Sequence, residues 1–113
     1  MTGDEVARRL GEGSIVLLDV RTRAEFEGLA GYPCDPRQGH IPGALHVQLE
    51  ELMTSPDPAA LLAARGADPE AEIVTYCHSG QRSELAAARL RASGLDAVNY
   101  VGSWHEWSRR ELG

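Results

Sequence analysis

The chain has 113 residues, of which 42% are hydrophobic and 25% are charged, as is ordinary for a soluble globular protein. We therefore expect residues 1–113 to form a single domain. The net charge of −6 argues against a nucleic-acid partner, because phosphate binding needs a basic surface. No apolar run approaches the ~20 residues of a membrane span, and the start of the chain lacks the apolar core of a secretory signal. A cytoplasmic protein without a membrane partner is expected.

The cysteines and histidines are sparse. Cys34 and Cys77 lie far apart and form no Cys-x-x-Cys pair, so free thiols in a reducing compartment are the better expectation. The spacing of the histidines matches no metal-binding motif, and we expect neither a metal nor a cofactor; they are His40, His46, His78 and His105.

The first third of the chain predicts a helix, a strand and a loop. Thr2 and Glu5 have the spacing of a capping box, which predicts a short helix ending at the glycines 11 and 13. Residues 14–20 are an almost continuous apolar run with β-branched members, which is typical of a strand covered on both faces. Residues 28–39 are rich in glycine and proline and predict a loop.

Strands and helices alternate over the rest of the chain. Residues 46–53 predict a strand end and a helical turn, and residues 57–65 predict a helix with Pro58 near its start. Residues 72–76 and 97–101 predict strands. Residues 83–93, followed by Gly94, and residues 103–110 predict helices. This alternation favours an α/β fold with a mainly parallel sheet.

The most informative segment runs from the strand at 72–76 into Cys77, a four-residue loop, and a helix that begins near Arg82 and Ser83. A thiol is therefore expected at the carboxyl end of a strand, where open α/β sheets bind ligands. Amides at the helix start and the Arg82 guanidinium both favour the thiolate. Gly80 allows the loop to curl so that its N–H groups face inward. The alternative is that Cys77 merely packs as a small buried side chain.

Four segments, in order and nearly from end to end, resemble rhodanese domains. They are Leu18–Arg21 followed by Glu25-Phe26, Gly39–Ala44 (Gly-His-Ile-Pro-Gly-Ala), Cys77–Ser83, and Gly102-Ser103 with Trp107. The resemblance implies a five-stranded, mainly parallel sheet flanked by helices on both faces. It also implies that Cys77 is the nucleophile and carries sulfur as a persulfide.

The resemblance further implies roles for the residues around the thiol. The inward-facing amides that bind the sulfur would belong to His78, Ser79, Gly80, Gln81 and Arg82. The side chains of His78 and Gln81 would point outward and tune access to the site. Residues expected to support the site without taking part in the chemistry are Asp19, Arg21, His40 and Ser83.

The expected activity is that of a thiosulfate sulfurtransferase, with a thiol, cyanide or a protein cysteine as the sulfur acceptor. Glu25 stands where tandem members of the family often carry a substrate-binding arginine, so that contact is expected to be missing. Anion binding would then fall to Arg82 and the loop amides. The loop also departs from the Cys-Gly-Ser-Gly form of mercaptopyruvate-specific relatives, which disfavours that donor.

Several alternatives stay open at this point. The domain is either catalytic, a non-catalytic binding module of the same fold, or a dedicated protein-to-protein sulfur carrier. A Cys-dependent phosphatase or arsenate reductase is disfavoured, because those enzymes need five residues between Cys and Arg and only residues 78–81 intervene here. Cys34 is expected to have no role, unless its loop brings it to Cys77 as a resolving thiol.

Overall fold

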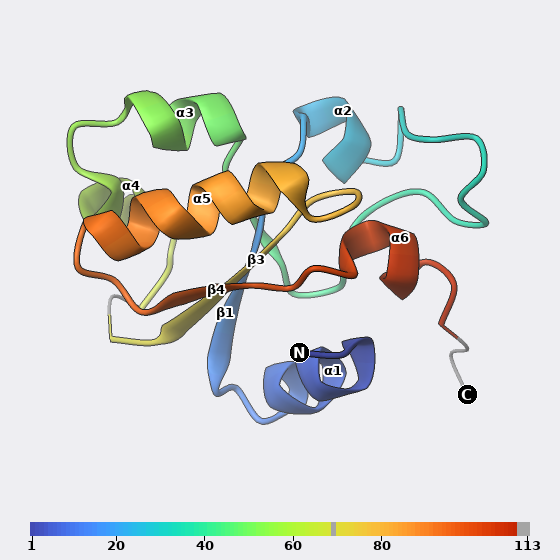
Figure 1. Ribbon diagram of the computed structural model, residues 1–113, viewed down its shortest axis with the longest axis horizontal. Coiled ribbons are helices and arrows are strands. Elements are labelled where there is room, and N and C mark those ends of the chain that lie inside the picture. Colours follow the sequence, from blue (N-terminus) through green and yellow to red (C-terminus); the bar gives the residue numbers. More distant parts are fainter. Residues whose placement is uncertain (69, 111–113) are drawn as a thin grey trace.

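The computed structural model describes residues 1–68 and 70–110, and it shows an α/β fold with one parallel sheet (Figure 1). The strands of the sheet lie in the order β2-β1-β3-β4, and every neighbouring pair is parallel. Their bounds are Ile15–Asp19 for β1, Leu45–His46 for β2, Glu72–Tyr76 for β3 and Ala97–Asn99 for β4. The parallel α/β architecture predicted from the sequence is confirmed.

The strand count implied by the resemblance is wrong for the described residues, which form four strands rather than five. The remaining segments are unsuited to a fifth. The chain is already helical at Gly3. The long segment before β2 contains Pro33, Pro36 and Pro42, which cannot donate to a strand ladder. That segment also bends at glycines with positive φ, among them Gly39 at +122°.

Helices cover both faces of the sheet (Figure 1). Helices α1 (Gly3–Gly11) and α6 (Ser103–Trp107) pack on one face, and α3 (Leu49–Thr54), α4 (Pro58–Ala64) and α5 (Gln81–Ala92) pack on the other. The short helix α2 (Arg23–Phe26) follows β1. In residues 1–68 and 70–110, no helix combines the length and the apolar character needed to cross a bilayer.

The two-residue period of β3 decides which way each of its side chains faces. Val74 and Tyr76 belong to the core on the α1 and α6 side, together with Trp104. Ile73 belongs to the opposite core, which includes Cys77 and side chains of α3, α4 and α5. Because successive side chains of a strand alternate between faces, Cys77 emerges from β3 on the side that α5 covers.

Most helix and strand positions agree with the sequence predictions, with shifts at the ends. The Thr2 hydroxyl caps α1 by accepting from the Glu5 amide at 3.2 Å, and Asp57 caps α4 ahead of Pro58. Helix α5 begins at Gln81, two residues earlier than predicted, and α6 ends at Trp107 rather than at residue 110. Helix α2 was not predicted.

Hydrogen bonds from side chains to main-chain carbonyls hold the long loop before β2 against α6 and the residue that follows it. Arg37 donates to the carbonyl oxygen of Trp107 at 2.7 Å and to that of Ser108 at 3.0 Å. In return, the indole N–H of Trp104 donates to the Arg37 carbonyl at 3.0 Å. The loop therefore has a defined position next to the segment that follows Cys77.

Candidate active site

Cys77 lies directly after β3 and is 1% exposed. Its N–H donates to the Ser103 hydroxyl at 3.1 Å, and its carbonyl oxygen accepts from the Trp104 amide at 2.9 Å. The Ser103 hydroxyl also donates to the Tyr100 carbonyl at 2.8 Å. Ser103 has a φ of +53°, a conformation that non-glycine residues adopt only when their surroundings enforce it. Ser103 therefore holds the backbone of Cys77 in place while its own backbone is strained.

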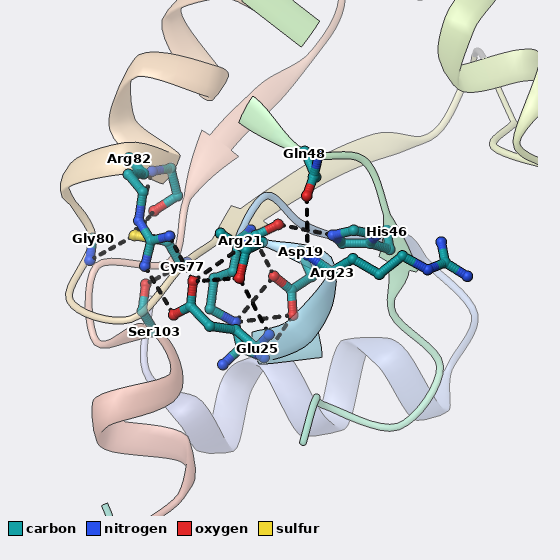
Figure 2. Close-up of polar contacts among 12 residues, drawn as sticks. Asp19, Arg21, Arg23, Glu25, His46, Gln48, Cys77, Gly80, Arg82 and Ser103 are labelled. Atoms are coloured by element: carbon teal, nitrogen blue, oxygen red, sulfur yellow. Dashed lines mark hydrogen bonds and ion pairs between the residues drawn. The ribbon is translucent and has the colours of Figure 1, made fainter. Parts of the chain in front are cut away.

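Three donors converge on the Cys77 sulfur. They are the Gly80 amide at 3.2 Å, the Ser83 amide at 3.4 Å and the Ser83 hydroxyl at 3.3 Å (Figure 2 shows Gly80 and Cys77). Burial on its own raises the pKa of the Cys77 thiol, but the hydrogen bonds from Ser83 and Gly80 outweigh it and leave the pKa below its ordinary value. The surroundings therefore favour a thiolate. Gly80 is one of the donors expected from the sequence, whereas Ser83, expected only to support the site, itself donates twice to the sulfur because the first turn of α5 brings it there.

Gly80 is required for the shape of the loop. Its φ is +93°, and a Cβ atom at this position would lie 2.7 Å from the carbonyl oxygen of Val101. The Gly80 carbonyl accepts from the Asn99 side-chain amide at 3.0 Å, which ties the start of α5 to the end of β4. The Gly80 N–H points inward at the Cys77 sulfur, as expected, while the inward direction of the other loop amides stays a prediction.

Arg82, which follows the thiol loop, forms an ion pair with Glu25 (Figure 2). Its Nη1 donates to Oε1 of Glu25 at 2.9 Å, and its Nη2 donates to Oε2 at 3.2 Å. Burial tends to raise the pKa of Glu25, but Arg82 and Thr22 bring it down to about 2. Glu25 in turn raises the pKa of Arg82. The carboxylate and the guanidinium are therefore both charged and largely neutralise each other.

The sequence did not predict Glu25 as the partner of Arg82, because helix α2 was not predicted. Thr22 and Glu25 form a reciprocal capping box at the start of α2, with the Glu25 amide donating to the Thr22 hydroxyl at 3.2 Å. The Thr-x-x-Glu spacing after β1 was a signal for this helix start. The cap fixes Glu25 on the side of α2 that meets Arg82.

Asp19 and Arg21 form a buried ion pair beside the site (Figure 2). The Arg21 Nη2 lies 2.8 Å from Oδ2 of Asp19 and also donates to the Gly39 carbonyl. The guanidinium carbon sits 5.1 Å from the centre of the Trp104 ring. The pair thus joins the end of β1 to the long loop and to α6, a position that suits the supporting role predicted for both residues.

His40 lies against α2 rather than against the thiol loop. Its Nδ1 is 2.8 Å from the Phe26 carbonyl oxygen, and its ring stacks on the Phe26 ring at 3.8 Å. Since α2 carries Glu25, His40 contacts the site through that helix. Its supporting role stays a prediction.

The expected outward direction of His78 is wrong, whereas Gln81 is exposed as expected. His78 is 7% exposed because the long loop covers it: its ring stacks on Tyr32 at 3.6 Å and its Nε2 lies 2.9 Å from Oδ2 of Asp35. Ser79 is exposed at the tip of the loop. Cys34 is an exposed free thiol, and its expected lack of a role stays a prediction.

Comparison with known proteins gives a consistent picture. A family model described as "Rhodanese-like domain" matches residues 2–110. A solved structure titled "Crystal Structure of Probable Thiosulfate Sulfurtransferase" is 44% identical, with a TM-score of 0.79 over 96% of this chain and 44% of that one. The thiosulfate sulfurtransferase of Azotobacter vinelandii is 33% identical over 92% of this chain and 41% of its own length.

A single-domain protein is also similar. The structure titled "Human Single Domain Sulfurtranferase TSTD1" is 31% identical, with a TM-score of 0.72, and the match covers 98% of this chain and 96% of that one. By contrast, the chain spans about two fifths of the length of the curated relatives. Those relatives are named for thiosulfate in some cases and for 3-mercaptopyruvate in others.

Proposed function

The chain belongs to the rhodanese-like domain family, and on that basis we propose that it moves sulfane sulfur from a donor to a thiophilic acceptor through a persulfide on Cys77. The observation that carries the proposal is the set of three donors on the buried sulfur, from Gly80 and Ser83. A thiolate is both the nucleophile and the leaving group that such a cycle needs.

The first step loads the enzyme. The Cys77 thiolate attacks the outer sulfur of thiosulfate, a bond between the two sulfurs forms, and the S–S bond of thiosulfate breaks. The electron pair of that bond leaves with sulfite. The products are sulfite and a Cys77 persulfide, and no proton transfer is needed because the nucleophile and the leaving group are both anions.

The second step unloads it. A thiolate, cyanide or the cysteine of a partner protein attacks the outer sulfur of the persulfide. The bond to Cys77 breaks and its electron pair returns to Cys77 as the thiolate. The donors from Gly80 and Ser83 stabilise negative charge on sulfur before and after each transfer, so the site needs little reorganisation.

The helix start supplies the proposed place for the outer sulfur. The first N–H groups of α5 have no partner inside the helix, and they follow Gly80 at the point where the loop encloses Cys77. A small cavity of about 90 Å³ nearby is lined by Arg21, Thr22 and Arg82, among others. Because Arg82 lines this cavity and also lies in the first turn of α5, we propose that a small donor approaches from this side.

Thiosulfate is the donor named for the relatives from Mycobacterium tuberculosis and Azotobacter vinelandii and is our first candidate, and a persulfide on a carrier protein is the second. The second is favoured by one observation: Glu25 already pairs with Arg82, so the site offers a dianion less positive charge than its loop arginine suggests. A protein donor relies on surface contacts and needs less of that charge. The exposed Ser79 and Gln81 belong to the thiol loop, and we propose that such a donor docks there.

The proposal also covers the cellular compartment and the part of the chain that carries the activity. We place it in a reducing, cytoplasmic compartment, since both cysteines are free thiols. We also propose that residues 1–113 carry the full activity as one domain. The near-complete match to the human single-domain protein supports this.

The test is thiocyanate formation from thiosulfate and cyanide by the wild type, Cys77→Ser and Cys34→Ser. We expect turnover in the wild type and in Cys34→Ser, and none above the uncatalysed rate in Cys77→Ser. Equal turnover in Cys77→Ser would contradict the proposal. Loss in Cys34→Ser would instead make the second cysteine a participant.

A further inference from the structure

A cluster of metal-ligating side chains lies beside the thiol loop and plays no part in the proposed sulfur transfer. One oxygen of Asp35 and one ring nitrogen each of His78 and His105 lie within 4.8 Å of one another. The three residues come from the long loop, the thiol loop and α6. Their sequence spacing gives no metal motif, which is why the sequence predicted no metal site.

Two of the three groups are buried without a hydrogen bond. Within the described residues, Asp35 Oδ2 and His78 Nε2 are inaccessible to solvent. They lie 2.9 Å apart and form an ion pair when His78 is protonated, but without the geometry of a hydrogen bond, and neither atom has another hydrogen-bonding partner. The side chain of Asp35 is 0% exposed and that of His78 is 9% exposed. Buried polar atoms without a partner are rare, because each one costs the free energy of its lost hydration. An ion bound between them would satisfy both atoms.

The third group opens the cluster to solvent. The His105 side chain is 53% exposed, and its Nδ1 lies 3.9 Å from Asp35 Oδ1. His105 and Arg109 also line an open hollow of about 510 Å³ on the surface, so the exposed member of the cluster faces solvent there. Partial exposure leaves His105 free to change rotamer and complete the site.

The charges around Asp35 leave one of its oxygens available. Arg109 Nη1 lies 2.7 Å from Oδ1 and donates to it, and Arg109 also donates to the Cys34 and His105 carbonyls. Oδ2 faces His78 instead. A carboxylate that binds a metal through one oxygen commonly holds a hydrogen bond on the other, which orients the ligand. Arg109 fits that second role.

We propose that Asp35 Oδ2, His78 Nε2 and His105 Nδ1 bind a divalent late first-row transition-metal ion such as Zn²⁺. Two imidazoles and one carboxylate are a ligand set for such ions and leave coordination positions open. The site ties the residue after Cys77 to α6, which the backbone bond from the His105 amide to the His78 carbonyl already joins at 2.9 Å. It is independent of the sulfur-transfer chemistry.

The test measures metal binding rather than activity, in a Cys34→Ser/Cys77→Ser protein so that thiols do not compete. Zn²⁺ is titrated against a chromogenic chelator, and the side-chain nitrogens of the histidines are followed by NMR. We expect one Zn²⁺ per chain, shifts at His78 and His105 only, and a rise in Tm with Zn²⁺. His105→Gln, at an exposed position that should not affect folding, should weaken binding by more than about tenfold.

The control is His46→Gln, which removes a histidine outside the cluster whose Nε2 lies 2.8 Å from the Arg21 carbonyl. It should bind Zn²⁺ as the Cys-free parent does. Absence of saturable binding in the parent, shifts at His40 or His46, or equal weakening in His46→Gln and His105→Gln would each overturn the proposal.

Discussion

Glu25 and Arg82 meet through two hydrogen bonds of 2.9 and 3.2 Å that join α2 to the first turn of α5. Glu25 is 8% exposed, so the pair is partly withdrawn from water. A carboxylate thus stands against the guanidinium at the loop that holds Cys77. The pair lowers the net positive charge next to Cys77, and it should make the stability of the folded protein depend on pH.

Substituting Glu25→Gln should improve the use of thiosulfate. The change removes the negative charge that faces Arg82, and we expect the KM for thiosulfate to fall about five-fold, corresponding to ~1 kcal/mol. Steady-state thiocyanate formation gives the KM. The control is Glu27→Gln, which removes an exposed carboxylate paired with Arg23 at 3.4 Å and should leave the KM unchanged. A KM that rises in Glu25→Gln would show that Arg82 depends on Glu25 for its position.

The same carboxylate should make stability depend on pH in the acid range. The folded protein lowers the pKa of Glu25 from 4.5 to about 2, so its contribution is complete above pH 4.5 and is lost as the pH falls toward 2. Urea unfolding should show Glu25→Gln less stable than the wild type at pH 6, by on the order of 2 kcal/mol after allowance for solvent screening. This difference should vanish near pH 2. A difference independent of pH would contradict the charge argument.

Ser83→Ala should raise the pKa of the Cys77 thiol. The hydroxyl donates to the sulfur at 3.3 Å, and losing one hydrogen bond to a charged group should shift the pKa upward by roughly one unit. The pH profile of iodoacetamide alkylation, in a Cys34→Ser background, reports this pKa. Ser79→Ala is the matched control, because Ser79 is exposed and its backbone amide remains. Overlapping profiles for Ser83→Ala and wild type would rule out the hydroxyl as a thiolate donor.

Gly80→Ala should disrupt the thiol loop. A left-handed backbone costs a non-glycine residue ~1–2 kcal/mol, and here the added Cβ would also meet the Val101 carbonyl at 2.7 Å. Gly94→Ala separates the two effects, since Gly94 has a φ of +86° and nothing within 4 Å of its Cβ position. Both variants should lose stability in urea, but only Gly80→Ala should slow sulfur loading by more than about tenfold. Equal loading rates would mean that the loop tolerates the contact.

The sequence predicts the fold well where local patterns and tertiary packing agree. The apolar runs 14–20 and 72–76 become β1 and β3, and Pro58 stands at the first turn of α4. The count of five strands, which came from the resemblance alone, is wrong for residues 1–68 and 70–110, which form four. Prolines and positive-φ glycines keep the segment before β2 out of the sheet.

Part of the site is predicted from the sequence, and the contacts that were not predicted share one physical cause. Cys77, Gly80 and the start of α5 form one continuous segment, so local reasoning finds them. The partners Glu25, Asp35 and Ser103 are distant in sequence and meet this segment only through the fold. His78 is the clearest case: a loop position suggests exposure, but Tyr32 and Asp35 cover it.

The most direct test of the central claim is the mass of the intact protein after incubation with thiosulfate and removal of excess donor. The wild type and Cys34→Ser should each gain one sulfur, about 32 Da, that cyanide discharges, whereas Cys77→Ser should gain none. A wild type that gains no mass from thiosulfate or from a persulfide donor, or a Cys77→Ser protein that gains the same discharged sulfur, would contradict a persulfide on Cys77.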